Sequence, residues 1–157
     1  MFEHWGTTPA ERVAHYPCQD LLPNGVLLTR GVDVHAPTEV VWRWVCQVQV
    51  APYSYDLVDN LGRRSPRTLT PGLEDVQVGA RVYPSFTVRH VEPGRSLTFT
   101  GMGVAISYVV SEGRLVGALA LRRRPVLTTL LAAGDLVMMR KQLLTFAELA
   151  ERDVLSG

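Results

Sequence analysis

Two side chains that can transfer protons lie in stretches of sequence that alternate as strands do. His90 shares the phase of Phe86 and Val88, so its imidazole is expected to face the same side as these apolar residues. Tyr108 shares the phase of Ile106 in a second stretch. In an apolar pocket, His90 could act as an acid or base, and Tyr108 could hydrogen-bond to an oxygen of a ligand.

Both side chains also have a purely structural interpretation. His90 could sit at a strand end and be satisfied by backbone or water, and Tyr108 could pack its ring with the hydroxyl at the rim. The pattern supplies no partner that would complete a catalytic pair with either residue. No catalytic residue is therefore assigned.

The segment "PYSYD" holds further candidates, Tyr53, Tyr55 and Asp56, with Asp59 three residues beyond. They could form a gate whose carboxylate orients a substrate. Alternatively, Asp56 caps a short helix around residues 57–61 and the tyrosines pack.

Arginines cluster in a loop at Arg63, Arg64 and Arg67 and at a strand end at Arg122–Arg124. They could bind a phosphate or an anionic headgroup, or they could simply solvate exposed ends of elements. The sequence contains no Gly-rich phosphate loop, no Ser/His/Asp arrangement and no zinc-ligand spacing. We therefore expect no metal and no cofactor.

Composition narrows the class of protein. The 157 residues are 46% hydrophobic, and 16 basic residues nearly balance 15 acidic ones, so no strong field favours nucleic acid as a partner. Cys18 and Cys46 do not make a disulfide framework. No signal peptide is visible, and the apolar stretch Val126–Met139 contains Asp135 and is shorter than the roughly 20 residues of a transmembrane helix. These features predict a cytoplasmic protein without a transmembrane segment.

The elements that must position these side chains begin with an irregular segment, residues 1–25, which is expected to pack on the domain. Val26–His35 alternates as a strand with one face made by Leu28, Arg30, Val32 and Val34. After Pro37, a helix is predicted over Thr38 to about Gln49, apolar over more than half its circumference and carrying two tryptophans.

The second half of the chain predicts an antiparallel meander and a long helix. Short turn signals separate four predicted strands: Arg81–Glu92, Arg95–Gly101, Val104–Ser111 and Leu115–Arg123. A helix follows over Val126–Arg152, and its second half carries a stripe of Leu136, Met139, Leu143, Phe146, Ala147 and Ala150. This order predicts an α+β fold, treated as one domain over residues 26–157.

The first half of that final helix is apolar almost all round. A helix covered by a sheet on one side needs only a stripe, so the excess apolar surface must meet something else. A ligand pocket is favoured, and the alternatives are the N-terminal segment, a dimer partner, a membrane surface and a plain core.

Four segments together resemble the START-like superfamily, also called Bet v 1-like or SRPBCC, which includes polyketide cyclases and lipid-transport domains. They are "VDVHAPTEVVWRWV" (32–45), "YSYDLVDNLG" (53–62), "VQVGARV" (76–82) and "GDLVMMRKQLL" (134–144). The resemblance implies a helix-grip fold, in which a curved antiparallel sheet wraps around a long C-terminal helix propped by two short helices. It also implies a hydrophobic cavity between the sheet and that helix.

The function expected on this basis is binding of a small hydrophobic or aromatic ligand, lipid- or polyketide-like. The expected lining is Trp42, Val45, Tyr55, Phe86, Val88, His90, Phe99, Ile106, Tyr108, Leu119, Leu130 and Met138. One alternative is a cyclase or dehydratase that uses His90 or Tyr108. Another is a protein-interaction module without a ligand, and a homodimer remains open.

Overall fold

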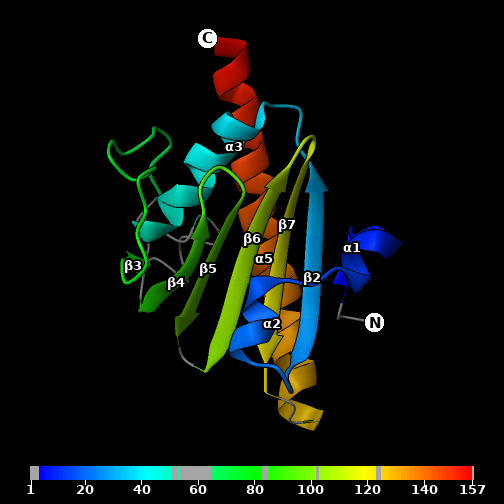
Figure 1. Cartoon of the computed structure of the whole chain (residues 1–157). Coiled ribbons are helices and arrows are strands. Elements are labelled where there is room, and N and C mark those ends of the chain that lie inside the picture. The colour runs from blue at the N-terminus through cyan, green and yellow to red at the C-terminus, as the bar shows by residue number, and fades with distance from the viewer. Residues whose placement is uncertain are drawn as a thin grey trace.

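The computed structural model of the chain describes residues 4–50, 53, 65–82, 85–101, 103–122 and 125–156; for residues 125–137 it describes the helix but not the side chains. Seven strands form one sheet in the order β1-β2-β7-β6-β5-β4-β3. The long helix α5 lies against one face of this sheet (Figure 1). The predicted α+β helix-grip fold is confirmed.

The antiparallel meander is built by β3 (Arg81–Val82), β4 (Phe86–Glu92), β5 (Ser96–Gly101), β6 (Val104–Ser111) and β7 (Arg114–Leu121). From β4 onward each strand pairs antiparallel with the next, as the short turn signals predict. The single strand predicted over Arg81–Glu92 is instead two strands, β3 and β4, which pair antiparallel with each other. The remaining long strand, β2 (Val26–Asp33), pairs antiparallel with β7 along its whole length. This pairing joins residues that are far apart in the sequence.

Two short helical segments follow β2. The helix α3 (Thr38–Val45) starts after Pro37, and the 3₁₀ turn η1 (Cys46–Gln49) continues it, so the predicted helix over 38–49 is present with a tightened last turn. Val41, Trp42, Trp44 and Val45 are buried. The helix expected around residues 57–61 lies outside the described residues.

The helix α5 (Pro125–Ser156) has 32 residues, about 48 Å at 1.5 Å per residue, and is longer than any strand it crosses. Met139, Leu143, Phe146, Ala147 and Ala150 are buried against the sheet, which confirms that part of the predicted stripe. Near the C-terminus, Trp44 Nε1 donates a hydrogen bond to Asp153 Oδ2 at 2.8 Å and ties α3 to α5.

One helix of the N-terminal segment packs on the opposite face of the sheet. The segment contains β1 (His4–Trp5), α1 (Pro9–Val13) and α2 (Pro17–Leu21), although the sequence predicts an irregular segment. In Figure 1, α2 crosses in front of β6 and β7, with α5 behind them. The Cys18 N–H donates to Ser107 Oγ at 3.0 Å, and Tyr16 and Cys18 pack on Ala105, Val116, Ala118 and Ala120.

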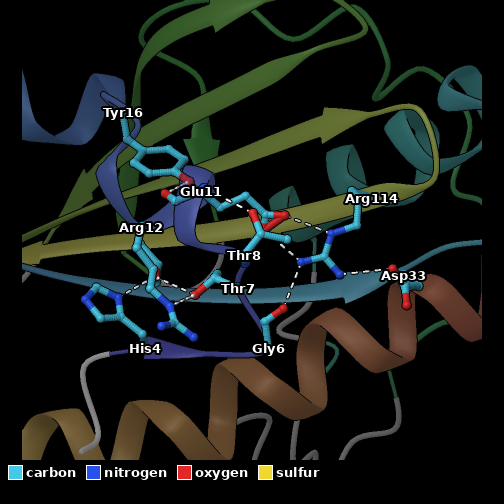
Figure 2. A network of polar contacts seen from close by, with 10 residues as sticks. His4, Gly6, Thr7, Thr8, Glu11, Arg12, Tyr16, Asp33 and Arg114 are labelled. Atoms are coloured by element: carbon cyan, nitrogen blue, oxygen red, sulfur yellow. Dashed lines mark hydrogen bonds and ion pairs between the residues drawn. The ribbon is translucent and has the colours of Figure 1, made fainter.

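Arg114, at the start of β7, holds this segment in place (Figure 2). Its Nη2 donates to Glu11 Oε2 at 2.7 Å and to the Gly6 carbonyl at 2.8 Å, and its Nη1 donates to Asp33 Oδ1 at 3.1 Å. Burial acts to raise the pKa of Glu11, but hydrogen bonds from Arg114 and from the Thr8 N–H hold it below its ordinary value of 4.5. The network therefore favours the charged carboxylate.

Candidate functional site

The concave face of the sheet, between the strands and α5, is the candidate site. Because side chains alternate along a strand, one phase of each strand points at α5. This phase is apolar and aromatic, and its buried members belong to one continuous core: Leu28, Val32, Val88, Leu97, Phe99, Tyr108, Leu115 and Leu119.

Arg30 lies in the same phase of β2 and is fully buried. It pairs in register with Gly117, and Gly117 pairs with Tyr108, so a row of three positions crosses the middle of the sheet. Two strand spacings, about 10 Å, separate Arg30 from Tyr108. Arg30 Nη1 donates to the Thr29 carbonyl at 2.9 Å.

A hydrogen bond between two side chains joins the sheet to α5. The Tyr108 hydroxyl donates a hydrogen bond to Gln142 Oε1, and the Tyr108 side chain is almost wholly buried. Arg30, Tyr108 and Gln142 therefore place polar atoms on an otherwise apolar surface. The sequence prediction included Tyr108 but missed Arg30 and Gln142.

A chain of aromatic rings runs through the same interior. Successive ring centroids lie 5.4 to 6.4 Å apart, in tilted or edge-to-face arrangements that aromatic pairs favour. In order, the rings are Trp44, Tyr53, Phe146, Tyr108, Phe99 and Phe86. This chain connects α3 to β4 across α5 and the sheet.

Most of the described residues in the expected lining lie in this core. Trp42, Val45, Val88, Phe99, Tyr108 and Leu119 are buried in it, and Phe86 and Ile106 are partly buried against it. Tyr55 lies outside the described residues, and the side chain of Leu130 is not described.

His90 is on the other face of the sheet, so the expectation that its imidazole points inward is wrong. The register between β4 and β5 shifts between Val88 and His90, where the strand bulges. Before the bulge, Val88 faces Phe99 on the concave side; after it, His90 faces Thr98 and is exposed. Val91, opposite Leu97, takes the inward position instead.

Met138 is also misplaced by the sequence prediction. Its side chain is 41% exposed, whereas the adjacent Met139 is buried and contacts the sheet at Gly117. One residue corresponds to about 100° of helical rotation, enough to move a side chain from the covered face to the open one.

Several further candidates are not among the residues that the structure describes. Asp56, Asp59, Arg63 and Arg64 lie outside the described residues. Within the described part of the chain, no group of three or more His, Cys, Asp or Glu side chains is placed to hold a metal ion. None of the described helices is long and apolar enough to cross a membrane.

No family model and no curated protein matches the chain in sequence. Solved structures do match in fold. A protein from Mesorhizobium loti has a TM-score of 0.49 and 14% identity, over 80% of this chain and 97% of its own. A protein of the dynemicin biosynthetic locus has a TM-score of 0.49 and 18% identity, over 83% of this chain and 48% of its own.

A polyketide-cyclase-like protein from Corynebacterium glutamicum has a TM-score of 0.47 and 16% identity, over 84% of this chain and 95% of its own. At these values the comparison concerns the fold alone. The helix-grip assignment rests on the strand order of this chain and on the position of α5.

Proposed function

We propose that the chain binds a small hydrophobic or aromatic molecule, lipid- or polyketide-like, between the concave face of the sheet and α5. The observation that carries this proposal is the position of Arg30, Tyr108 and Gln142 within an apolar and aromatic interior. Sites for small molecules are typically apolar with a few polar groups that fix orientation.

Affinity would come chiefly from burial of apolar ligand surface. At about 25 cal/mol per Å², burying roughly 300 Å² contributes about 7.5 kcal/mol before the costs of ordering and immobilisation. The rings of Phe99, Tyr108 and Phe146 suit a planar, unsaturated ligand, because aromatic pairs favour tilted and edge-to-face contacts.

Orientation would come from the polar groups. The Tyr108 hydroxyl and the Gln142 amide can exchange hydrogen bonds with a carbonyl or hydroxyl oxygen. The guanidinium of Arg30 favours the end of the ligand that carries partial or full negative charge.

His90 is no longer a candidate for proton transfer in the cyclase or dehydratase alternative, because its imidazole is exposed on the outer face of the sheet. Tyr108 stays the candidate for proton transfer. No described contact favours turnover over binding.

The test begins with native mass spectrometry of freshly purified protein, followed by denaturation and identification of any released molecule. A hydrophobic fluorescent probe then measures binding in wild type, Tyr108→Phe and Arg30→Met. The matched control is Arg43→Met, because Arg43 is exposed on α3.

We expect the two interior variants to weaken binding, by up to about tenfold for each strong polar contact removed, and Arg43→Met to bind as wild type does. Circular dichroism verifies that each variant is folded. An apo mass together with no probe binding by the wild type contradicts the proposal.

A further inference from the structure

A groove separate from the interior lies where the end of β2 passes α5. It has a volume of about 600 Å³ and is lined by Asp33, Leu144, Ala147, Glu148, Glu151, Arg152, Leu155 and Ser156. In Figure 2, Asp33 lies at the end of its strand next to the ribbon of α5. The groove therefore opens on the surface along the last turns of the helix.

The wall formed by α5 carries apolar side chains that nothing in the described structure covers. Leu155 is 88% exposed and Leu144 is 42% exposed. With Glu148 and Glu151, these leucines follow a spacing of four, three and four residues, which places all four side chains on one helical stripe. The two leucines therefore offer apolar contacts at the two ends of this stripe, with the glutamates between them.

The charge of the groove is predominantly acidic. Asp33, Glu148 and Glu151 contribute three carboxylates, of which Asp33 is paired with Arg114 at 3.1 Å, and Arg152 is the one basic side chain among the lining residues. The guanidinium of Arg152 is engaged outside the groove, because its Nη2 donates to Asp153 Oδ1 at 2.9 Å and to the Arg67 carbonyl at 2.6 Å. Glu151 Oε1 accepts from the His35 N–H at 2.9 Å, which fixes that carboxylate at the rim.

We propose that this groove docks a basic amphipathic helix of a partner protein. From Leu144 to Leu155 the stripe spans about 17 Å, or three turns, at 1.5 Å per residue. A helix lying alongside would place apolar residues against the two leucines and Lys or Arg side chains against Glu148 and Glu151. The proposal is independent of ligand binding in the interior.

Charge also argues against a second copy of the chain as the occupant. A two-fold axis perpendicular to α5 sets the same stripe against itself in antiparallel order. With Leu144 opposite Leu155 of the other copy, Glu148 would lie opposite Glu151. Like charges placed in this way repel, whereas a basic partner neutralises them.

The experiment uses the full chain and a fluorescein-labelled synthetic peptide of about 16 residues, with leucines 11 apart and two lysines between them, long enough to cover three turns. Fluorescence anisotropy measures its binding to wild type, Glu148→Lys and Leu155→Ser. Both substituted side chains are exposed, so both variants should fold. Matched controls are Glu92→Lys and Val78→Ser, exposed positions that are far in sequence from every residue lining the groove.

We expect the lysine peptide to bind wild type and both controls, with affinity that falls as salt rises. Glu148→Lys and Leu155→Ser should each weaken binding by about tenfold. A peptide with glutamates in place of the lysines should prefer Glu148→Lys over wild type. Three results would overturn the proposal: no binding by wild type at about 100 μM peptide, equal binding by Glu148→Lys, or a wild-type dimer that Leu155→Ser dissociates.

Discussion

Met139 of α5 lies directly over Gly117 in the middle of β7. A Cβ added at Gly117 would stand 2.8 Å from Met139 Sδ and 3.4 Å from the Tyr108 ring. The missing side chain thus lets the helix approach the sheet closely between Arg30 and Tyr108.

Replacing Gly117 with Val should lower the free energy of unfolding by roughly 1–3 kcal/mol, because the branched side chain overlaps the thioether of Met139. Met139→Ala makes room, so the double variant should be more stable than the sum of the two single effects predicts. Urea denaturation of all four proteins measures this coupling. Strictly additive effects would mean that Met139 does not limit the space at Gly117.

The N-terminal segment should loosen in acid. Because the folded state holds the pKa of Glu11 below 4.5, the stabilisation is fully present above that pH and is lost as pH falls through the folded-state pKa. Glu11→Gln should flatten this part of the pH profile of stability. Thermal unfolding between pH 7 and pH 3 measures it, with Asp75→Asn, an exposed position, as the control.

The two thiols should resist modification in the folded protein. Burial raises the pKa of Cys18, and burial together with nearby Glu74 raises the pKa of Cys46 to about 12. Both side chains are fully buried, so neither accessible thiolate nor space for a reagent is present at pH 8. A chromogenic disulfide reagent should react slowly with native protein and rapidly after guanidinium is added. Fast stoichiometric labelling of native protein contradicts this expectation.

The tie between α3 and α5 should contribute measurably to stability. Asp153→Leu removes the acceptor of the Trp44 indole N–H, and Trp44→Phe removes the donor. Each change should cost about 1–2 kcal/mol, and the double variant should cost less than their sum. Chemical denaturation tests this, and full additivity would show that the hydrogen bond is not shared as described.

The sheet was predictable because its signals are local. Period-two alternation and short Gly-containing turns mark each hairpin, and they gave the strand order of the meander directly. Pairing of β2 with β7 joins distant segments, which no local signal in the sequence encodes, and it was not predicted.

Site residues were less predictable where a local irregularity, such as a β-bulge, changes the face of the sheet on which the following side chains lie. A strict two-residue alternation does not account for the bulge after Val88 and therefore places His90 on the wrong face of the sheet. Arg30 has the same strand phase as Leu28 and Val32, and it is fully buried. It was not predicted as a site residue, because a charged residue is seldom wholly buried on an apolar face. The signal available in the sequence was the alternation that places Arg30 on the same face as Leu28 and Val32.

The N-terminal elements were missed because they are only a few residues long. A usable signal was present in Thr8-Pro-Ala-Glu11, which forms a capping box in the structure. Sequence alone does not show that such a short helix will be held by Arg114, more than a hundred positions away.

The sheet ends on both sides in a strand of only two residues, β1 and β3. Edge strands present unpaired N–H and C=O groups that can recruit another molecule into a growing assembly. Because β1 pairs only with Thr29 and Arg30, it divides the outer edge of β2 into the short runs Val26–Leu28 and Gly31–Asp33. Among the described residues neither run offers a long template, so β1 makes this edge of a valine- and leucine-rich strand a poor site for adding a further strand.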